Sequence, residues 1–212
     1  MTNIALDLVG QATLVLKRAG EVEGTGRSED ALAFLRDARE YRNALMLELP
    51  NGDFGFTMIR QYLFSVFAMH QWDALSRVGD ADLAGIAAKA LKESRYHVRH
   101  AGEWVVRLGD GTDESHARAQ DALDSLWPYT GELFMSDSVE QALAADGLAV
   151  DCSTLKAAWD ADVNELLAPA TLRRPADAYM QRGGRSGLHT EHLGHMLAEM
   201  QVLQRTHPRA EW

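Results

Sequence analysis

The chain has 212 residues, of which 46% are hydrophobic and 25% charged, so it can bury a continuous core as a globular protein. Its formal net charge of -10 argues against unaided binding to nucleic acid or to an anionic membrane surface. The single cysteine, Cys152, excludes an intramolecular disulfide framework, and no apolar run approaches the roughly 20 residues of a membrane span. The start, MTNIALDLVG, lacks the basic region of a signal peptide, so a cytoplasmic location is expected.

Apolar residues at helical spacing predict helices in the first half of the chain. The first begins near Ile4 and is ended by the glycines at 20 and 24. Three more helices are expected at about 28–49, 57–76 and 82–108, separated by turn-forming segments. The longer of the predicted helices carry a stripe of apolar and small polar residues, as expected for helices that pack against one another.

The second half continues the same pattern. The turn GDGTDES leads into a helix that runs to about residue 134 with a kink at Pro128, and capped helices follow at about 138–145 and 153–167. The segment RRPADAYMQRGGRSG is predicted to be a long loop. A final helix is expected to start near His189 and to stop before Pro208.

No segment alternates apolar and polar residues between hairpin turns, so the predicted fold class is all-α. Long central helices joined by short turns favour a helical bundle. We expect one domain over residues 1–212, with a core bundle at about 3–135 and a helical extension at about 138–212.

The stretch KESRYH raises the question of a metal site. Carboxylate-bridged di-iron bundles place Glu-x-x-His on a helix, and here Ser94 stands three residues before His97, where the glutamate would be. The first helix offers Leu8 and Gln11 at the same spacing, and the third offers Ser65. Leucine cannot bind iron, and neutral hydroxyl and amide groups bind it poorly. We therefore predict a metal-free interior with no catalytic residue and no cofactor.

The remaining imidazole, His97, is interpreted as a hydrogen-bonded core histidine rather than a ligand. Gln11 and Ser94 are the expected partners of its two ring nitrogens, because buried amides and hydroxyls also need partners.

A second group of histidines lies in GLHTEHLGHM, where His189, His192 and His195 are three residues apart and Glu191 stands among them. Two of them could reach one metal ion on a helix. Histidines near a helix start are more often capping or interface groups, so His189, Glu191 and His192 are predicted to be partner contacts.

Four arginines in the predicted loop form a basic cluster in an acidic chain. Guanidinium groups bind phosphates through paired hydrogen bonds, so the cluster is a candidate phosphate contact; the alternatives are a solvated loop or a docking surface for an acidic partner. No glycine-rich phosphate motif and no serine-nucleophile motif accompanies it. The cluster consists of Arg173, Arg174, Arg182 and Arg185.

Several stretches closely resemble the C-subunit family (PaaC) of bacterial phenylacetyl-CoA epoxidase, in one order from Thr2 to Trp212. They are TNIALDLVGQA, LPNGDFGFTMIRQYLF, ALKESRYHVRHAGEWVVRLGDGTDES, LW with YTGELF, and GLHTEHLGHMLAEMQVLQRTHP. The resemblance implies a ferritin-like four-helix-type bundle with additional helices. It also implies a metal-free subunit that binds and stabilises a di-iron catalytic A subunit, whose motifs look like D-E-A-G-H and E-E-S-F-H where this chain has DLVGQ and ESRYH.

The resemblance carries further expectations. Family members have another helix ahead of TNIALDL, so that first helix is expected to be missing here, and a neighbouring chain would fill its groove or an apolar stripe would be exposed. The expected partners are the A subunit, a second copy of this chain in a higher-order assembly, and acyl-CoA through indirect contact. The resemblance makes the CoA phosphates the candidate ligand of the arginine cluster.

Two functions remain open at this point. The first is a non-catalytic, structural subunit of the epoxidase complex. The alternative is a cryptic metal-dependent or acid-base enzyme that uses His97, Glu93 and the histidines at 189–195. Glu93 is adjacent to Ser94 in sequence and points about 100° away from it on a helix, which weakens the alternative.

Overall fold

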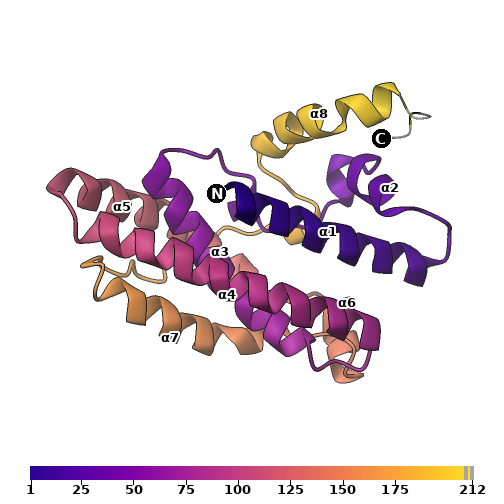
Figure 1. Cartoon of the computed structure of the whole chain (residues 1–212), viewed down its shortest axis with the longest axis horizontal. Coiled ribbons are helices and arrows are strands. Elements are labelled where there is room, and N and C mark those ends of the chain that lie inside the picture. Colours follow the sequence, from indigo (N-terminus) through magenta and orange to yellow (C-terminus); the bar gives the residue numbers. More distant parts are fainter. Residues whose placement is uncertain (208–209, 211–212) are drawn as a thin grey trace. The chain divides into compact units, whose positions relative to one another are not determined.

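The computed structural model describes residues 1–207 and 210 and contains helices but no strand within that part of the chain (Figure 1). The all-α prediction is confirmed. The chain forms two compact units: unit 1 contains 1–50 and 182–212, and unit 2 contains 51–181. The predicted single domain with its core and extension stays a prediction. No helix among the described residues is long and apolar enough to cross a membrane.

Unit 2 is built on two long helices, α3 (Phe54–Leu75) and α4 (Ala81–Gly109), which pack along each other after a short turn. Both begin at an aspartate whose carboxylate accepts hydrogen bonds from the first helical N–H groups: Asp53 caps α3 and Asp80 caps α4. The remaining elements of the unit are α5 (Asp113–Leu126), η3 (Trp127–Phe134), α6 (Ser138–Ala145), η4 (Cys152–Leu155) and α7 (Lys156–Leu167).

Aromatic residues hold the later elements of unit 2 onto α3. The buried Trp159 ring of α7 lies 5.6 Å from Trp127 and 5.3 Å from Phe134, centroid to centroid. Its indole N–H donates to the carbonyl of Leu63 on α3 at 2.8 Å, so the polar atom of a buried indole is satisfied. The helix predicted to run to about 134 is α-helical only to Leu126 and continues as the 3-10 helix η3, with Pro128 in its first turn; the predicted kink stays a prediction.

Unit 1 contains α1 (Thr2–Glu23), α2 (Glu29–Phe34) and α8 (Glu191–Thr206), with short 3-10 helices η1 (Ala38–Glu40), η2 (Leu45–Leu47) and η5 (Gly184–Ser186). Gly24 ends α1 in the left-handed conformation, with a φ of 68°, which a glycine adopts without steric cost. The loop predicted at 173–187 is irregular except for η5. Pro208, the predicted stop of the last helix, lies outside the described residues.

The predicted helix over about 28–49 is wrong. Only α2, six residues long, is α-helical there, and η1 and η2 follow. Asp37 and Glu40 form a capping box: the Asp37 backbone N–H donates to Glu40 Oε2 at 2.6 Å, so side chains satisfy groups that a continuing helix would have used. The Tyr41 hydroxyl also donates to the Ala33 carbonyl and folds the segment back on itself.

A substitution in α4 tests the packing at its end. A Cβ atom at Gly109 would lie 2.1 Å from the carbonyl oxygen of Ala170, whereas one at Gly85 on the same helix would meet nothing within 4 Å. We expect Gly109→Ala to lower the free energy of unfolding by about 1–3 kcal/mol, because backbone must shift. Gly85→Ala is the control and should raise it by about 0.5–1 kcal/mol. Urea unfolding followed by circular dichroism measures both; equal effects would contradict the close approach.

Candidate functional site

The buried polar stripe of unit 2 is where a metal site would be expected. Ser65 on α3 and Ser94 and His97 on α4 are 1%, 1% and 2% exposed. Gln61 donates to the Ser65 hydroxyl at 2.8 Å, and the His97 ring packs against Tyr96 with centroids 6.1 Å apart. The three predicted positions of this unit are therefore core residues on the two central helices.

The donors of this stripe do not match the needs of iron. Two hydroxyls and one imidazole provide no bridging carboxylate, which hard iron ions require. Among residues 1–207 and 210 no group of three or more His, Cys, Asp or Glu side chains is arranged to hold a metal ion. In unit 1, Gln11 is buried and Leu8 is half-buried on α1. The predicted contacts of His97 with Gln11 and Ser94 stay predictions.

A buried carboxylate organises unit 1, and the sequence did not indicate it. Glu48 is 2% exposed and accepts four hydrogen bonds. Its Oε1 accepts from His189 Nδ1 at 2.6 Å and from Asn43 Nδ2 at 2.8 Å, and its Oε2 accepts from the backbone N–H and the hydroxyl of Thr190, both at 2.8 Å. All the donors needed by a buried carboxylate are thus present.

His189 occupies the other side of this cluster. Its Nε2 lies 3.1 Å from the carbonyl oxygen of Tyr41, while its Nδ1 faces Glu48. Both ring nitrogens therefore face oxygen atoms of unit 1. His189 therefore ties the start of α8 to the segment after η1. Glu191 and His195 are exposed and His192 is half-buried on α8.

The predicted arginine cluster is divided between the two units. Arg174 is an ion-pair residue of unit 2: it lies 2.8 Å from Asp160 Oδ1 and 3.6 Å from Asp177 Oδ2, and its guanidinium packs over the Trp127 ring at 4.7 Å. Lys156 approaches Asp160 from the other side at 2.6 Å. Arg174 is thus engaged in holding the loop before residue 181 against α7 rather than free for a phosphate.

The other three arginines behave differently. Arg173 is exposed, while its backbone N–H donates to Gln120 Oε1 at 2.8 Å. Arg182 is exposed and Arg185 half-buried, and both belong to unit 1. Their proposed contact with CoA phosphates or a partner stays a prediction.

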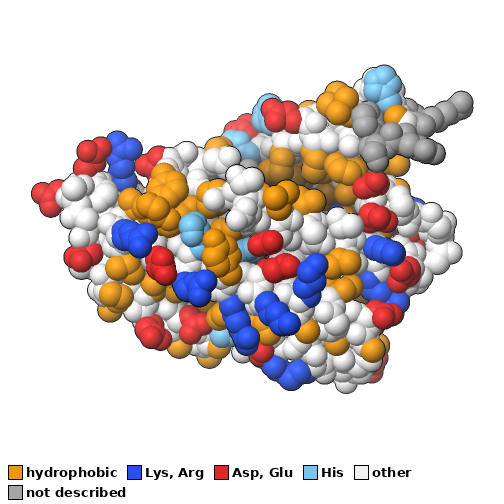
Figure 2. Space-filling model, viewed as in Figure 1, with side chains coloured by type: hydrophobic (Ala, Val, Ile, Leu, Met, Phe, Trp, Pro, Cys, Tyr) orange, Lys and Arg blue, Asp and Glu red, His pale blue; other side chains and the backbone are white. Residues whose placement is uncertain are grey.

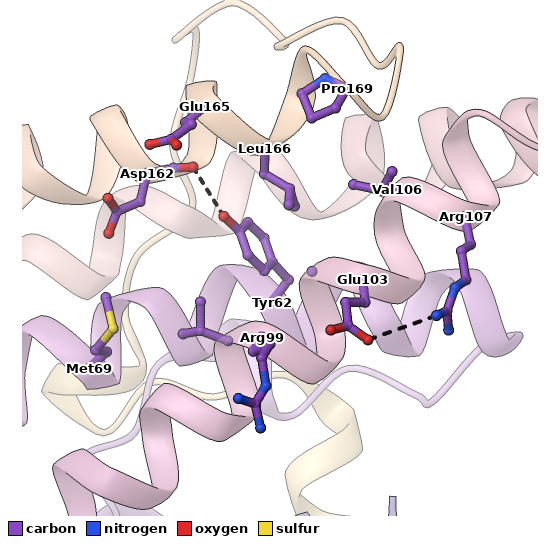
Figure 3. Close-up of a pocket in the computed structure, with 12 residues that line it drawn as sticks. Tyr62, Met69, Arg99, Glu103, Val106, Arg107, Asp162, Glu165, Leu166 and Pro169 are labelled. Atoms are coloured by element: carbon purple, nitrogen blue, oxygen red, sulfur yellow. Dashed lines mark hydrogen bonds and ion pairs between the residues drawn. The ribbon is translucent and has the colours of Figure 1, made fainter.

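A hollow lies within unit 2, lined by residues of α3, α4 and α7 with its following turn (Figure 3). It has a volume of about 680 Å³. Tyr62 rises from α3 into the middle and donates its hydroxyl hydrogen to the backbone carbonyl of Asp162 at 3.1 Å. Burial raises the pKa of Tyr62, and the negative charges of Asp162 and Glu165 raise it further, so the phenol stays protonated.

Comparison with known proteins identifies the family of this chain. A family model described as "Phenylacetic acid catabolic protein" matches residues 1–212. The chain belongs to this family. It is also 48% identical over 212 residues to the C subunit of the 1,2-phenylacetyl-CoA epoxidase of Escherichia coli (strain K12), an alignment that covers 100% of this chain and 85% of that relative. The resemblance found in the motifs is thereby confirmed.

The structure assigns different surroundings to the predicted site residues. Of the predicted site residues, His189 joins a structural cluster and Arg174 an ion-pair network, while Ser65, Ser94 and His97 fill the core of unit 2. A further residue, Glu48, was missed because one acidic residue in a predicted helix carries no signal of burial. The closeness of Glu48 to His189 links positions 141 residues apart in sequence.

A test of the Glu48 cluster uses an isosteric change. Glu48→Gln replaces an acceptor oxygen by an NH2 group that must face donors, so we expect the free energy of unfolding to fall by about 2–4 kcal/mol. Glu199→Gln, on the exposed face of α8, is the control and should change it by less than about 0.5 kcal/mol. Chemical denaturation measures both. A loss at Glu48 no larger than at Glu199 would refute the structural role.

The Arg174 network predicts that the stability of the fold depends on pH. Burial tends to raise the pKa of Asp160, but hydrogen bonds from Lys156 and Arg174 outweigh it, and the pKa is lowered. A carboxyl with a depressed folded-state pKa stabilises the fold above its unfolded pKa, and this contribution is lost as the pH falls through the folded-state value. Wild type should therefore exceed Asp160→Asn in stability at about pH 7, and the difference should shrink below about pH 4.

Denaturation midpoints across this pH range measure the Asp160 effect. Asp121→Asn, at an exposed position of α5, provides the matched loss of one negative charge. A stability difference between wild type and Asp160→Asn that does not change with pH would contradict the ion-pair origin.

Proposed function

We propose that this chain is the non-catalytic, structural subunit of a phenylacetyl-CoA 1,2-epoxidase, a multicomponent oxygenase of aerobic phenylacetate catabolism. In this proposal it acts in the cytoplasm, binds the di-iron catalytic A subunit and stabilises it. The chain contributes no catalytic residue, metal or cofactor of its own. Acyl-CoA would contact it only indirectly, through the assembled complex.

The main support for this proposal is the chemistry of the buried polar stripe in unit 2. Ser65 and Ser94 stand on the two central helices where an iron-binding bundle would need carboxylates, and His97 lacks the glutamate three residues before it. A relative named as the C subunit of 1,2-phenylacetyl-CoA epoxidase, 48% identical over the whole chain, supports the role of a subunit. Together they favour a protein that works through binding rather than through chemistry of its own.

Exposed apolar side chains supply surface for binding in unit 1. On α8 the outward face carries Met196, Met200 and Leu203 at spacings of four and three residues, and on α1 Leu6 and Val9 are also exposed. Such spacings form a stripe along one helical face. Stable subunit interfaces bury large apolar areas, so these stripes fit contacts with the A subunit or with a second copy of this chain.

The alternative of a cryptic enzyme gains no support from the histidines. His189 has both ring nitrogens occupied by Glu48 and Tyr41, so it is not available as an acid, base or ligand. His192 and His195 belong to no group of His, Cys, Asp or Glu side chains arranged for a metal in the described chain.

Co-expression with the di-iron A subunit of the same source tests the proposal. We expect the two chains to co-purify in equal amounts as one species in size-exclusion chromatography, with iron bound only in the complex. Elemental analysis of this chain alone should give iron well below one ion per chain. His97→Ala in the complex should leave epoxidation turnover per A subunit unchanged.

Two results would contradict the structural role. One is near-stoichiometric iron in this chain alone, which would reopen His97 as a ligand. The other is separate migration of the two chains at micromolar concentration after co-expression, which would remove the A subunit as a stable partner.

A further inference from the structure

We propose that the cleft of unit 2 is a helix-docking groove: it takes an amphipathic helix of the partner subunit, with acidic side chains on the flank facing α4. This inference rests on the proposed function and assigns the partner to a particular surface. The groove is defined by its lining residues, from α3 (Tyr62, Met69), α4 (Val98, Arg99, Gly102, Glu103, Val106, Arg107) and α7 with its following turn (Asp162, Glu165, Leu166, Pro169).

The floor of the groove is apolar. Met69, Val98, Val106 and Leu166 present only carbon and sulfur atoms. The polar atom that reaches the middle, the Tyr62 hydroxyl, is already bonded to the backbone carbonyl of residue 162. Sites for small molecules carry a few polar groups that fix the orientation of the ligand within the pocket. This floor instead suits a row of apolar side chains.

Gly102 allows the three helices that line the groove to approach one another closely. A Cβ atom there would lie 3.2 Å from Leu166 Cδ1 and 3.3 Å from Tyr62 Cε2, so three helices come together at this point. On the α4 wall, Gly102 is flanked by Val98 and Val106, each one turn away. The close contact at Gly102 thus brings α4 near to both α3 and α7 within the groove lining.

Charged groups line both walls, and their balance differs: the α4 wall carries Arg99, Glu103 and Arg107, with an excess of positive charge, whereas the α7 wall is acidic. Arg99 and Arg107 are exposed on the α4 wall, where Arg107 lies 3.9 Å from Glu103, a distance too long for a strong ion pair. On the α7 wall are Asp162, which pairs with His70 at 2.7 Å, and Glu165. An apolar centre with a charged rim is the anatomy of a protein interface.

The positive character continues along α4 beyond the groove. Lys92, Arg95 and Arg99 are exposed at spacings of three and four residues and share one helical face. Figure 2 shows Lys and Arg side chains gathered over α4 on a chain whose net charge is -10. An acidic flank on the partner helix complements this wall, and basic side chains on the opposite flank complement Asp162 and Glu165.

The dimensions fit a helix of two to three turns. Arg99 and Arg107 are eight residues apart on α4, which corresponds to about 12 Å along the axis. Helices that dock into grooves use apolar residues at i, i+3 or i+4 and i+7, a span of about 10 Å. The groove therefore accommodates three anchoring side chains of one helix.

The experiment uses the full-length chain co-expressed with the di-iron subunit. We expect hydrogen exchange at 99–107 and 162–169 to slow on complex formation, and Arg99→Glu with Arg107→Glu to weaken the complex by about tenfold or more, because like charges then face the acidic flank. Arg77→Glu with Arg118→Glu is the matched control, since both arginines are exposed in unit 2, lie outside the groove and give the same charge change.

The outcomes separate this inference from the proposed function. The groove proposal is contradicted if the groove amides remain unprotected in the wild-type complex and Arg99→Glu with Arg107→Glu leaves its affinity unchanged, or lowers it no more than the control pair does. The proposal of a structural subunit would still stand in that case. Failure of the wild-type chain to form any complex overturns both.

Discussion

The pairing of α3 with α4 is the constraint on which unit 2 depends. The two long helices pack along each other, and Gly102 and Gly109 let neighbouring backbone and side chains approach α4 closely. Trp159 then fixes α7 to α3 through its packing and its hydrogen bond to Leu63. Because α7 is fixed to α3, a groove remains between α7 and α4. The geometry of the surface thus follows from how the core is packed.

Unit 1 depends on a different kind of interaction. The carboxylate of Glu48 is buried, and its stabilisation comes from donors supplied by Asn43, His189 and Thr190. A buried charge without its donors is strongly destabilising, so the segment before α3 and the start of α8 must fold together. The polar motif GLHTEH therefore has a structural function in this protein, whatever further contacts its exposed residues make.

A bundle whose interior lacks iron-binding chemistry can still bind a partner protein through its outer faces. With Ser65, Ser94 and His97 at the core positions, the bundle interior does not need to hold clustered negative charge, which is costly in the absence of a metal. Such an interior can be packed for stability alone. The outer faces of the helices are then the surfaces on which function depends, and the two groove walls differ in their balance of charge.

The sequence by itself determined the helical class, most helix boundaries and the absence of carboxylates at 65 and 94, because periodicity, capping residues and ligand types are local properties. It also determined the family through its motifs. Tertiary structure alone decided that 28–49 is not one helix, that Glu48 and His189 are partners, and that Arg174 is held by Asp160. The physical reason is the same each time: burial and hydrogen bonding join residues far apart in sequence, and no local pattern records which of them will meet.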